Sequence, residues 1–395
     1  MIDYSVLLND TLKDIKPSGI RKFFDLLSSM DGVTALTVGQ PDFVTPWHIR
    51  EAAITSLEDG KTYYTSNAGM NELRAAISRY MERRFSLKYC AKSEIFVTVG
   101  GSEAIDIAIR ALVNPGDEVI LPTPSFVCYG PIAKMAGATV VELPTYACDE
   151  FKLTPEALRA AITPKTKLLI LPYPANPTGA VLRREELEAI ADVLRDTNVA
   201  VLSDEIYAEL TYGGNHVSIA SIDGMRERTV LVSGFSKAYA MTGWRLGYIC
   251  APEPLLSQML KLHQYAIMCA PTVSQFAAIE AMEQGDGDVE MMCAEYNRRR
   301  IFIHDGLKRI GLNSVMPEGA FYIFPDISGF GLTSEEFCER LLYEEKCAIV
   351  PGTAFGDSGE GYARISYAYS TKHIAEALEK IERFIKRLPH SGKTK

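Results

Sequence analysis

The chain has 395 residues, enough for two to three domains and for a core that folds without disulfide bonds. It is 47% hydrophobic and 23% charged, and these fractions exclude a disordered tail, a coiled coil and a disulfide-rich miniprotein. With 41 basic and 50 acidic residues, the net charge of −9 excludes binding of nucleic acid or an anionic membrane by bulk electrostatics.

Cysteine spacing and the N-terminus bear on the cellular compartment. The eight cysteines form no CxxC pair and lack zinc-ribbon spacing, so we expect buried, reduced thiols and no metal site. Residues 1–4 lack a basic start that leads into an apolar stretch, so we expect no signal peptide. The uncharged run 262–279 carries too many polar groups for a membrane span and is predicted as a buried loop and helix start. Together these features predict a cytoplasmic protein.

The middle of the chain alternates short apolar runs with helical patterns, such as those over 102–113 and 184–197. The apolar runs are rich in Val, Ile and Leu and are predicted as strands buried on both faces: 95–99, 118–121, 139–143, 167–171, 199–202, 229–233 and 246–250. This alternation predicts an α/β domain with a mostly parallel sheet flanked by helices.

The last hundred residues have a different pattern, which predicts a second, α+β domain. We expect helices over 291–310, 334–345 and 372–387, with strands over 319–324 and 362–366.

A glycine pair follows the first predicted strand in Gly100-Gly101-Ser102-Glu103-Ala104. Glycines permit a tight turn, and the N-terminus of the helix that follows offers free N–H groups to a phosphate. A plain glycine turn with Ser102 as the N-cap explains the same pattern.

Two further strand ends carry titratable side chains. Asp204 ends one strand, where it can meet a cationic ligand group, although taken alone a helix cap or a structural ion pair is the more common role of such an acid. Lys237 follows Ser233-Gly234-Phe235-Ser236, where desolvation would lower its pKa and free a nucleophilic amine. A solvated surface lysine is the alternative.

Three more polar residues lie near strand ends or within a strand. Asn176 begins Asn-Pro-Thr-Gly after a strand, and this segment also suits a turn. Arg245 and Arg364 can bind anions or pair with protein acids. Taken together, the strand-end residues predict a small anionic cofactor that is held by a lysine.

These motifs resemble class I/II pyridoxal-phosphate-dependent aminotransferases of fold type I, and most closely the I-gamma subgroup. The resemblance implies a large domain over 49–288 with a mostly parallel seven-stranded sheet, and a smaller α+β domain built from 1–48 and 289–395. The matching stretches run in family order over roughly 17–370: Pro17-Ser18-Gly19-Ile20-Arg21, Gly39-Gln40-Pro41-Asp42-Phe43, Tyr64-Thr65, Gly69, Glu72-Leu73-Arg74, 100–104, 176–179, 203–207, 235–245 and 363–366.

For the cofactor, pyridoxal 5′-phosphate, the resemblance assigns roles residue by residue. Lys237 would hold it as a Schiff base and move the proton, and Asp204 would pair with the ring nitrogen. Asn176 and Tyr207 would bond the ring oxygen O3′. Phe126 would stack on the ring, although core packing also explains it. The phosphate would be bound by Gly101, Ser102, the backbone N–H of Glu103, Ser236 and Arg245.

For the substrate, the resemblance implies that Arg364 clamps the α-carboxylate, with Asn176 and the backbone of Gly39 beside it. Tyr64 would reach the phosphate in the neighbouring subunit of a homodimer. The implied reaction moves an amino group from an L-amino acid, aspartate, aromatic or related, to a 2-oxo acid such as 2-oxoglutarate. Arg21 is a candidate for a side-chain carboxylate or a plain surface charge.

One departure and several alternatives remain. Gly234 stands where many relatives have serine, so one phosphate contact is absent or replaced. A Cβ–S lyase of the same fold would use the same residues. A transcription regulator would need a DNA-binding domain, for which about sixteen residues before Pro17 are too few. The full set of site residues argues against a non-enzymatic scaffold.

Overall fold

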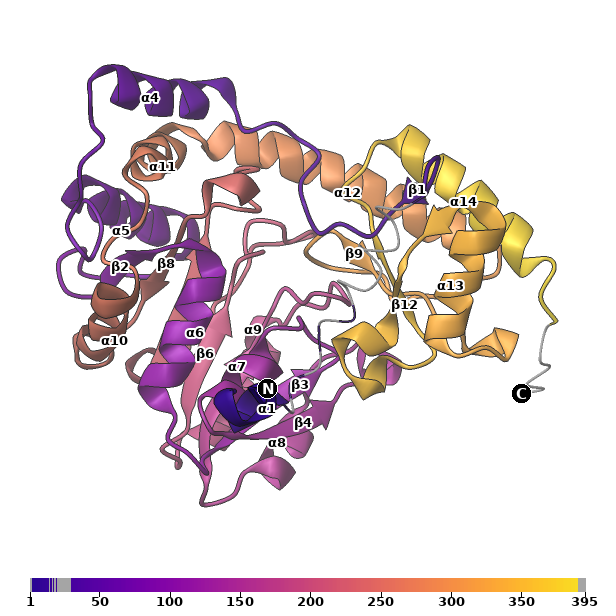
Figure 1. Cartoon of the computed structure of the whole chain (residues 1–395), viewed down its shortest axis with the longest axis horizontal. Helices are drawn as coiled ribbons and strands as arrows, with labels where there is room; N and C mark the ends of the chain where they lie inside the picture. Colours follow the sequence, from indigo (N-terminus) through magenta and orange to yellow (C-terminus); the bar gives the residue numbers. More distant parts are fainter. Residues whose placement is uncertain (1, 14, 16, 18, 20–29, 390–395) are drawn as a thin grey trace.

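A seven-stranded sheet forms the centre of the molecule (Figure 1). The computed structural model describes residues 2–13, 15, 17, 19 and 30–389. The strand order is β2 (Ile95–Thr98), β8 (Gly247–Cys250), β7 (Thr229–Gly234), β6 (Ala200–Asp204), β5 (Thr166–Leu171), β3 (Glu118–Thr123) and β4 (Thr139–Pro144). All neighbours are parallel except for β8, which is antiparallel to both β2 and β7. The predicted mostly parallel sheet is therefore confirmed.

Helices cover both faces of the sheet because alternate strand residues point to opposite sides. In β5, Leu168 and Ile170 pack with α6 and α7, whereas Leu169 and Leu171 pack with α8 and α9. Helix α10 joins the first face, and α4, α5 and α11 cover the remaining half of the second. Their bounds are α4 (Trp47–Glu58), α5 (Asn71–Phe85), α6 (Gly100–Leu112), α7 (Tyr129–Met135), α8 (Pro155–Ala161), α9 (Arg184–Leu194), α10 (Glu253–Ala266) and α11 (Thr272–Gln284).

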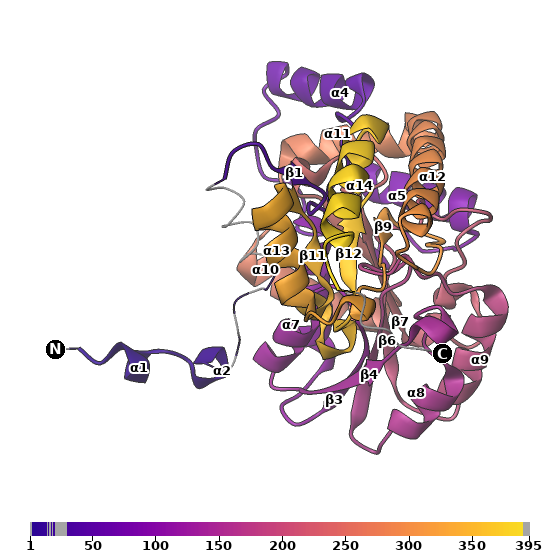
Figure 2. The same cartoon turned by 90° about the vertical axis from the view of Figure 1, so that its right-hand side faces the viewer.

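The C-terminal part is a smaller α+β unit beside the sheet, drawn in orange and yellow in Figures 1 and 2. Its three-stranded sheet has the order β11 (Val350–Pro351), β12 (Ala363–Ser366) and β9 (Tyr322–Ile323). Helices α12 (Asp286–Arg309), α13 (Ser334–Glu345) and α14 (Thr371–Ile385) share one apolar core with it. The predicted fold class is thus confirmed for both parts.

An N-terminal segment pairs with this unit. Short helices α1 (Tyr4–Leu7) and α2 (Asp10–Lys13) come first, and β1 (Thr34–Ala35) then lies parallel to β10 (Cys347–Ala348). This pairing supports the predicted discontinuous small domain, whose boundaries at 48 and 289 remain a proposal.

Two expectations about burial were wrong. All eight cysteines are free, but the side chains of Cys90 and Cys148 are exposed rather than buried. The stretch 262–279 does form the end of α10, a loop and the start of α11, but its Tyr265 is 87% exposed. No helix in the described part of the chain is long and apolar enough to cross a membrane.

A close contact between β7 and β8 leaves room only for glycine. Gly234 lies opposite Gly247, and a Cβ on Gly234 would lie 2.9 Å from the Cα of that residue. A Cβ on Gly247 would in turn lie 2.7 Å from the carbonyl carbon of Gly100, at the start of α6. These glycines bring α6 against the end of the sheet.

We therefore expect Gly234→Ser to lower the free energy of unfolding by about 1–3 kcal/mol, because the added atoms overpack a rigid backbone contact. Denaturant unfolding measures this loss. The matched control is Gly287→Ser, since Gly287 is exposed and its Cβ would meet nothing within 4 Å. Equal stability of the two variants would contradict the prediction.

Candidate active site

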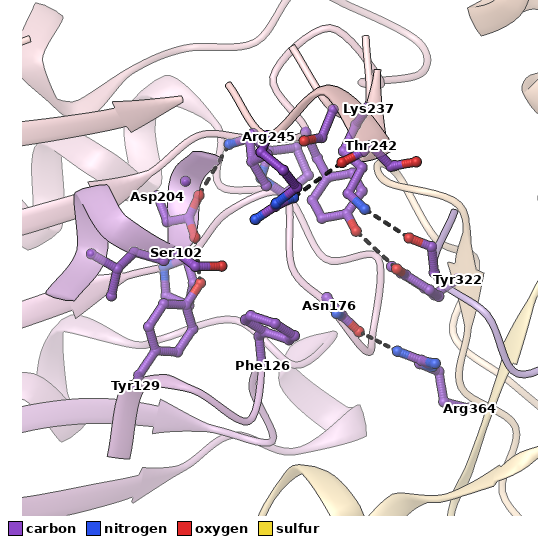
Figure 3. A pocket seen from close by; sticks show the side chains of 18 of the residues that line it. Ser102, Phe126, Tyr129, Asn176, Asp204, Lys237, Thr242, Arg245, Tyr322 and Arg364 are labelled. Carbon is purple, nitrogen blue, oxygen red and sulfur yellow. Dashed lines mark hydrogen bonds between the residues drawn. The ribbon is translucent and has the colours of Figure 1, made fainter. Parts of the chain in front are cut away.

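The candidate active site is a cavity of about 290 Å³ at one edge of the central sheet (Figure 3). Strands β2, β3, β5, β6 and β7 all end at this edge, and ligands of α/β sheets collect at such ends. The antiparallel β8 begins there, which brings Arg245 to the same place. The cavity is lined by Thr37, Gly39, Gly101, Ser102, Ile105, Phe126, Tyr129, Pro172, Pro174, Asn176, Asp204, Ile206, Tyr207, Ser236, Lys237, Thr242, Arg245, Tyr322 and Arg364.

Most of the predicted site residues therefore come together, although the sequence separates them by hundreds of positions. Two do not line the cavity. Tyr64 is 75% exposed, and Glu103 turns its carboxylate away toward His263, whose Nδ1 lies 2.7 Å from it. Arg21 lies outside the described residues.

Lys237 carries an amine that is poised to be neutral. Its Nζ donates a hydrogen bond of 2.7 Å to the carbonyl oxygen of Gly39. Burial and, to a smaller extent, the positive charges of Arg364 and Arg245 lower the pKa of Lys237 to about 8, although the negative charge of Asp204 opposes them. A neutral amine is nucleophilic, so this lysine can attack a carbonyl near neutral pH.

Asp204 is a buried carboxylate at the end of β6. It accepts a hydrogen bond of 2.6 Å from the hydroxyl of Tyr129 and one of 3.1 Å from the backbone N–H of Ile206. Burial raises the pKa of Asp204, and the hydrogen bonds from Tyr129 and Ile206 offset part of that rise. A cationic ligand group would therefore be stabilised beside it.

Two arginines present positive charge without a carboxylate partner. Arg364 donates to Asn176 Oδ1 at 3.0 Å and to the carbonyl oxygen of Thr37 at 2.5 Å. Arg245 donates to the carbonyl oxygen of Thr242 at 3.1 Å. Within the described residues neither forms an ion pair, so both guanidinium charges remain available to anions.

The start of α6 and Arg245 form a phosphate-sized cradle. Gly101 and Ser102, in the first turn of this 13-residue helix, line the cavity together with Ser236. Gly100 has a φ of +75°, which favours glycine, and a Cβ there would lie 2.7 Å from the Arg245 guanidinium. No hydroxyl stands at Gly234, but those of Ser102, Ser236 and Thr242 line the cavity.

Sequence reasoning missed several lining residues, and three of them contact a predicted residue that lies far away in the sequence. Tyr129 bonds Asp204, the carbonyl of Thr37 bonds Arg364, and the Tyr322 hydroxyl lies 2.8 Å from that of Tyr207. No motif marks them, because each reaches its partner from another strand or loop.

These features together define an enzyme class. A family model, aminotransferase class I and II, matches residues 31–381. The chain belongs to this family and is an aminotransferase.

Individual relatives of this chain are also named as aminotransferases. YugH of Bacillus subtilis (strain 168), named as an aminotransferase, is 54% identical over 96% of this chain and 98% of its own length. The aspartate aminotransferase of Pyrococcus abyssi (strain GE5 / Orsay) is 45% identical over 96% of this chain and 98% of that protein. The solved aromatic aminotransferase of Pyrococcus horikoshii OT3 superimposes with a TM-score of 0.88 at 44% identity, covering 93% of this chain and 98% of that one.

We expect the Lys237 amine of the cofactor-free chain to react with an amine-directed reagent half-maximally near pH 8, because only the neutral form is nucleophilic. Arg364→Met should move this midpoint to higher pH, since it removes a positive charge that disfavours the protonated amine. Mass spectrometry of the labelled peptide measures both.

The matched control is Arg195→Met, which removes an exposed arginine paired with Asp192 and should leave the midpoint unchanged. A midpoint that is the same with and without the Arg364 guanidinium would contradict the electrostatic explanation.

Proposed function

We propose that this aminotransferase binds pyridoxal 5′-phosphate in the cavity around Lys237. In this proposal it moves the amino group of an L-amino acid, aspartate or an aromatic one, to a 2-oxo acid such as 2-oxoglutarate. The observation that carries the proposal is the Lys237 amine, whose pKa is held near 8 in a cavity shared with one buried acid and two uncompensated arginines. When bound, this cofactor supplies an aldehyde for amines and a ring that accepts electrons from the substrate Cα.

The residues present fit the three ends of this cofactor. The cradle of Gly101, Ser102, Ser236 and Arg245 suits its phosphate, with the backbone N–H of Glu103 in the same helical turn. Asp204, fixed by Tyr129, suits a protonated ring nitrogen. On the other sides, Phe126 would stack on the ring, while Asn176 and Tyr207 would bond its O3′ oxygen.

Lys237 and Arg364 would divide the work on the substrate. Arg364 would bind the α-carboxylate, and the amide of Asn176 is already held beside it through a 3.0 Å hydrogen bond. The backbone of Gly39 would lie against the substrate. Lys237 would hold the cofactor covalently and, once released, take the proton from the substrate Cα as a neutral base.

The side-chain preference is open to a direct test. If Arg245 binds phosphate and Arg364 binds the α-carboxylate, the lining residues of the described chain supply no further arginine for an acidic side chain. Aspartate, phenylalanine and alanine should each be offered with 2-oxoglutarate. Pyruvate release from cystathionine would instead support a Cβ–S lyase.

Lys237→Ala should abolish the covalent absorbance band of the cofactor and reduce turnover by about 10³-fold or more, because nucleophile and base are lost together. Spectra and steady-state rates measure this. Lys88→Ala, at an exposed lysine, is the control and should keep both. Wild-type turnover in the Lys237 variant would sink the proposed function.

We further propose a cytoplasmic homodimer, with Tyr64 reaching the phosphate of the other copy. Tyr63, Tyr64, Tyr265, Ile267 and Met268 are all exposed, and large exposed apolar groups mark interaction surfaces. Their two segments are tied together, since Asn67 donates to the Met268 carbonyl at 2.8 Å and Thr272 donates to that of Tyr63 at 2.6 Å. This arrangement supports an interface there.

Subunit mixing tests the role of Tyr64. A Lys237→Ala chain and a Tyr64→Ala chain, each impaired alone, should together regain about a quarter of wild-type turnover, because half the dimers are mixed and each holds one intact site. Co-expression with two affinity tags isolates the mixed dimer, whose turnover should be about half of the wild-type value. Failure to regain activity, with dimers present, would rule out a contribution in trans.

A further inference from the structure

Tyr322 is a buried phenol that contacts both Arg364, the proposed substrate-binding arginine, and Tyr207, a proposed cofactor-binding residue. It lies in β9, paired opposite Ser366 of β12, the strand that carries Arg364, and is 1% exposed. Its hydroxyl is 2.8 Å from the hydroxyl of Tyr207. Tyr207 is the residue expected to bond the O3′ oxygen of the cofactor.

The surroundings of Tyr322 hold its hydroxyl in this one place. The Arg364 guanidinium carbon lies 4.5 Å from the centroid of the Tyr322 ring, within the range of a cation–π contact. On the far side, a Cβ on Gly39 would overlap the Tyr322 hydroxyl, so this glycine makes the room that the phenol occupies. The ring of Tyr207 packs edge-on against that of Tyr322 at 5.9 Å.

One of the two phenolic protons of Tyr207 and Tyr322 is not used in the hydrogen bond between them. Each phenol has one proton to donate, and the two hydroxyls share a single hydrogen bond. Among the described residues, neither hydroxyl forms a hydrogen bond to any other group. The second proton is therefore free to point into the cavity.

The contacts of the two phenols favour Tyr322 as the donor. The Arg364 guanidinium lies over the ring of Tyr322, and its positive charge makes the Tyr322 hydroxyl a stronger donor. Tyr207 is the phenol expected to meet the O3′ oxygen, which is an acceptor, so Tyr207 gives its proton to O3′ and its own oxygen accepts from Tyr322. Burial raises the pKa of both phenols, so both keep their protons near neutral pH.

We propose that Tyr322 is a positioning residue that acts through Tyr207: it donates to the Tyr207 oxygen and thereby directs the Tyr207 proton at the O3′ oxygen of the bound cofactor. A hydroxyl that accepts a hydrogen bond becomes a stronger donor, so the effect is on strength as well as direction. This inference rests on the proposed function, because it requires the cofactor in the cavity.

The test is Tyr322→Phe, which removes one hydroxyl and keeps the ring. In the holoenzyme, the pH midpoint of the cofactor absorbance change should rise by about half a unit, the size of a modest hydrogen bond. The sign follows because a less stabilised O3′ oxygen leaves the nitrogen linked to Lys237 protonated to higher pH.

A double variant isolates the route. Tyr207→Phe should raise the midpoint by more than Tyr322→Phe, and the double variant should match Tyr207→Phe alone, because Tyr322 acts only through that residue. Tyr367→Phe is the matched control. Tyr367 is buried in the same core and bonds the Ala320 carbonyl at 3.1 Å without lining the cavity, so the midpoint should not move.

Three outcomes would overturn the inference: an unmoved midpoint in Tyr322→Phe, additive shifts in the double variant, or a raised KM for the amino acid alone. The last would mean that Tyr322 contacts substrate directly. Failure of the proposed function is distinguishable, because a wild-type chain that binds no pyridoxal phosphate shows no such absorbance band in any variant.

Discussion

The site depends on the placement of three cationic side chains, those of Lys237, Arg245 and Arg364, around one cavity. Arg245 and Arg364 are hydrogen-bonded to neutral oxygens, so their charges are not cancelled inside the protein. Burial and these charges together make protonation of Lys237 unfavourable, and Asp204 opposes them. The same arrangement that is suited to bind two anions thus also raises the fraction of the amine that is neutral and reactive near neutral pH.

The fold brings this charge together through the direction of its strands. The strand ends before Ser102, Phe126, Asn176, Asp204 and Lys237 meet at one edge because those strands run the same way. The reversed strand β8 is what adds Arg245, since it begins where its neighbours end. The glycine contact between β7, β8 and the start of α6 then sets how closely the helix N-terminus approaches that arginine.

The strands and most of the site were predictable because their signals are local. A buried parallel strand is a short apolar run, and its end is visible as a change to Gly, Ser, Asp or Lys. Tyr129, Thr37 and Tyr322 were not predictable, because what matters about them is the distant residue that each one meets. The exposure of Tyr265 was not predicted for a related reason. Its stretch is uncharged, and the sequence alone does not show whether another part of the protein covers it.

Main-chain carbonyls connect the two parts of the molecule at the site itself. Arg364 belongs to the small sheet and Lys237 follows a strand of the large one, yet both donate to the same short segment, at Thr37 and Gly39. Side-chain substitutions cannot remove these acceptors, so changes in this segment act by moving the backbone. Gly39 is the sensitive point, because any side chain there would collide with the Tyr322 hydroxyl and displace the carbonyl that holds the amine. The positions of Lys237, Arg364 and Tyr322 are therefore coupled through this segment. A side chain at position 39 would disturb all three.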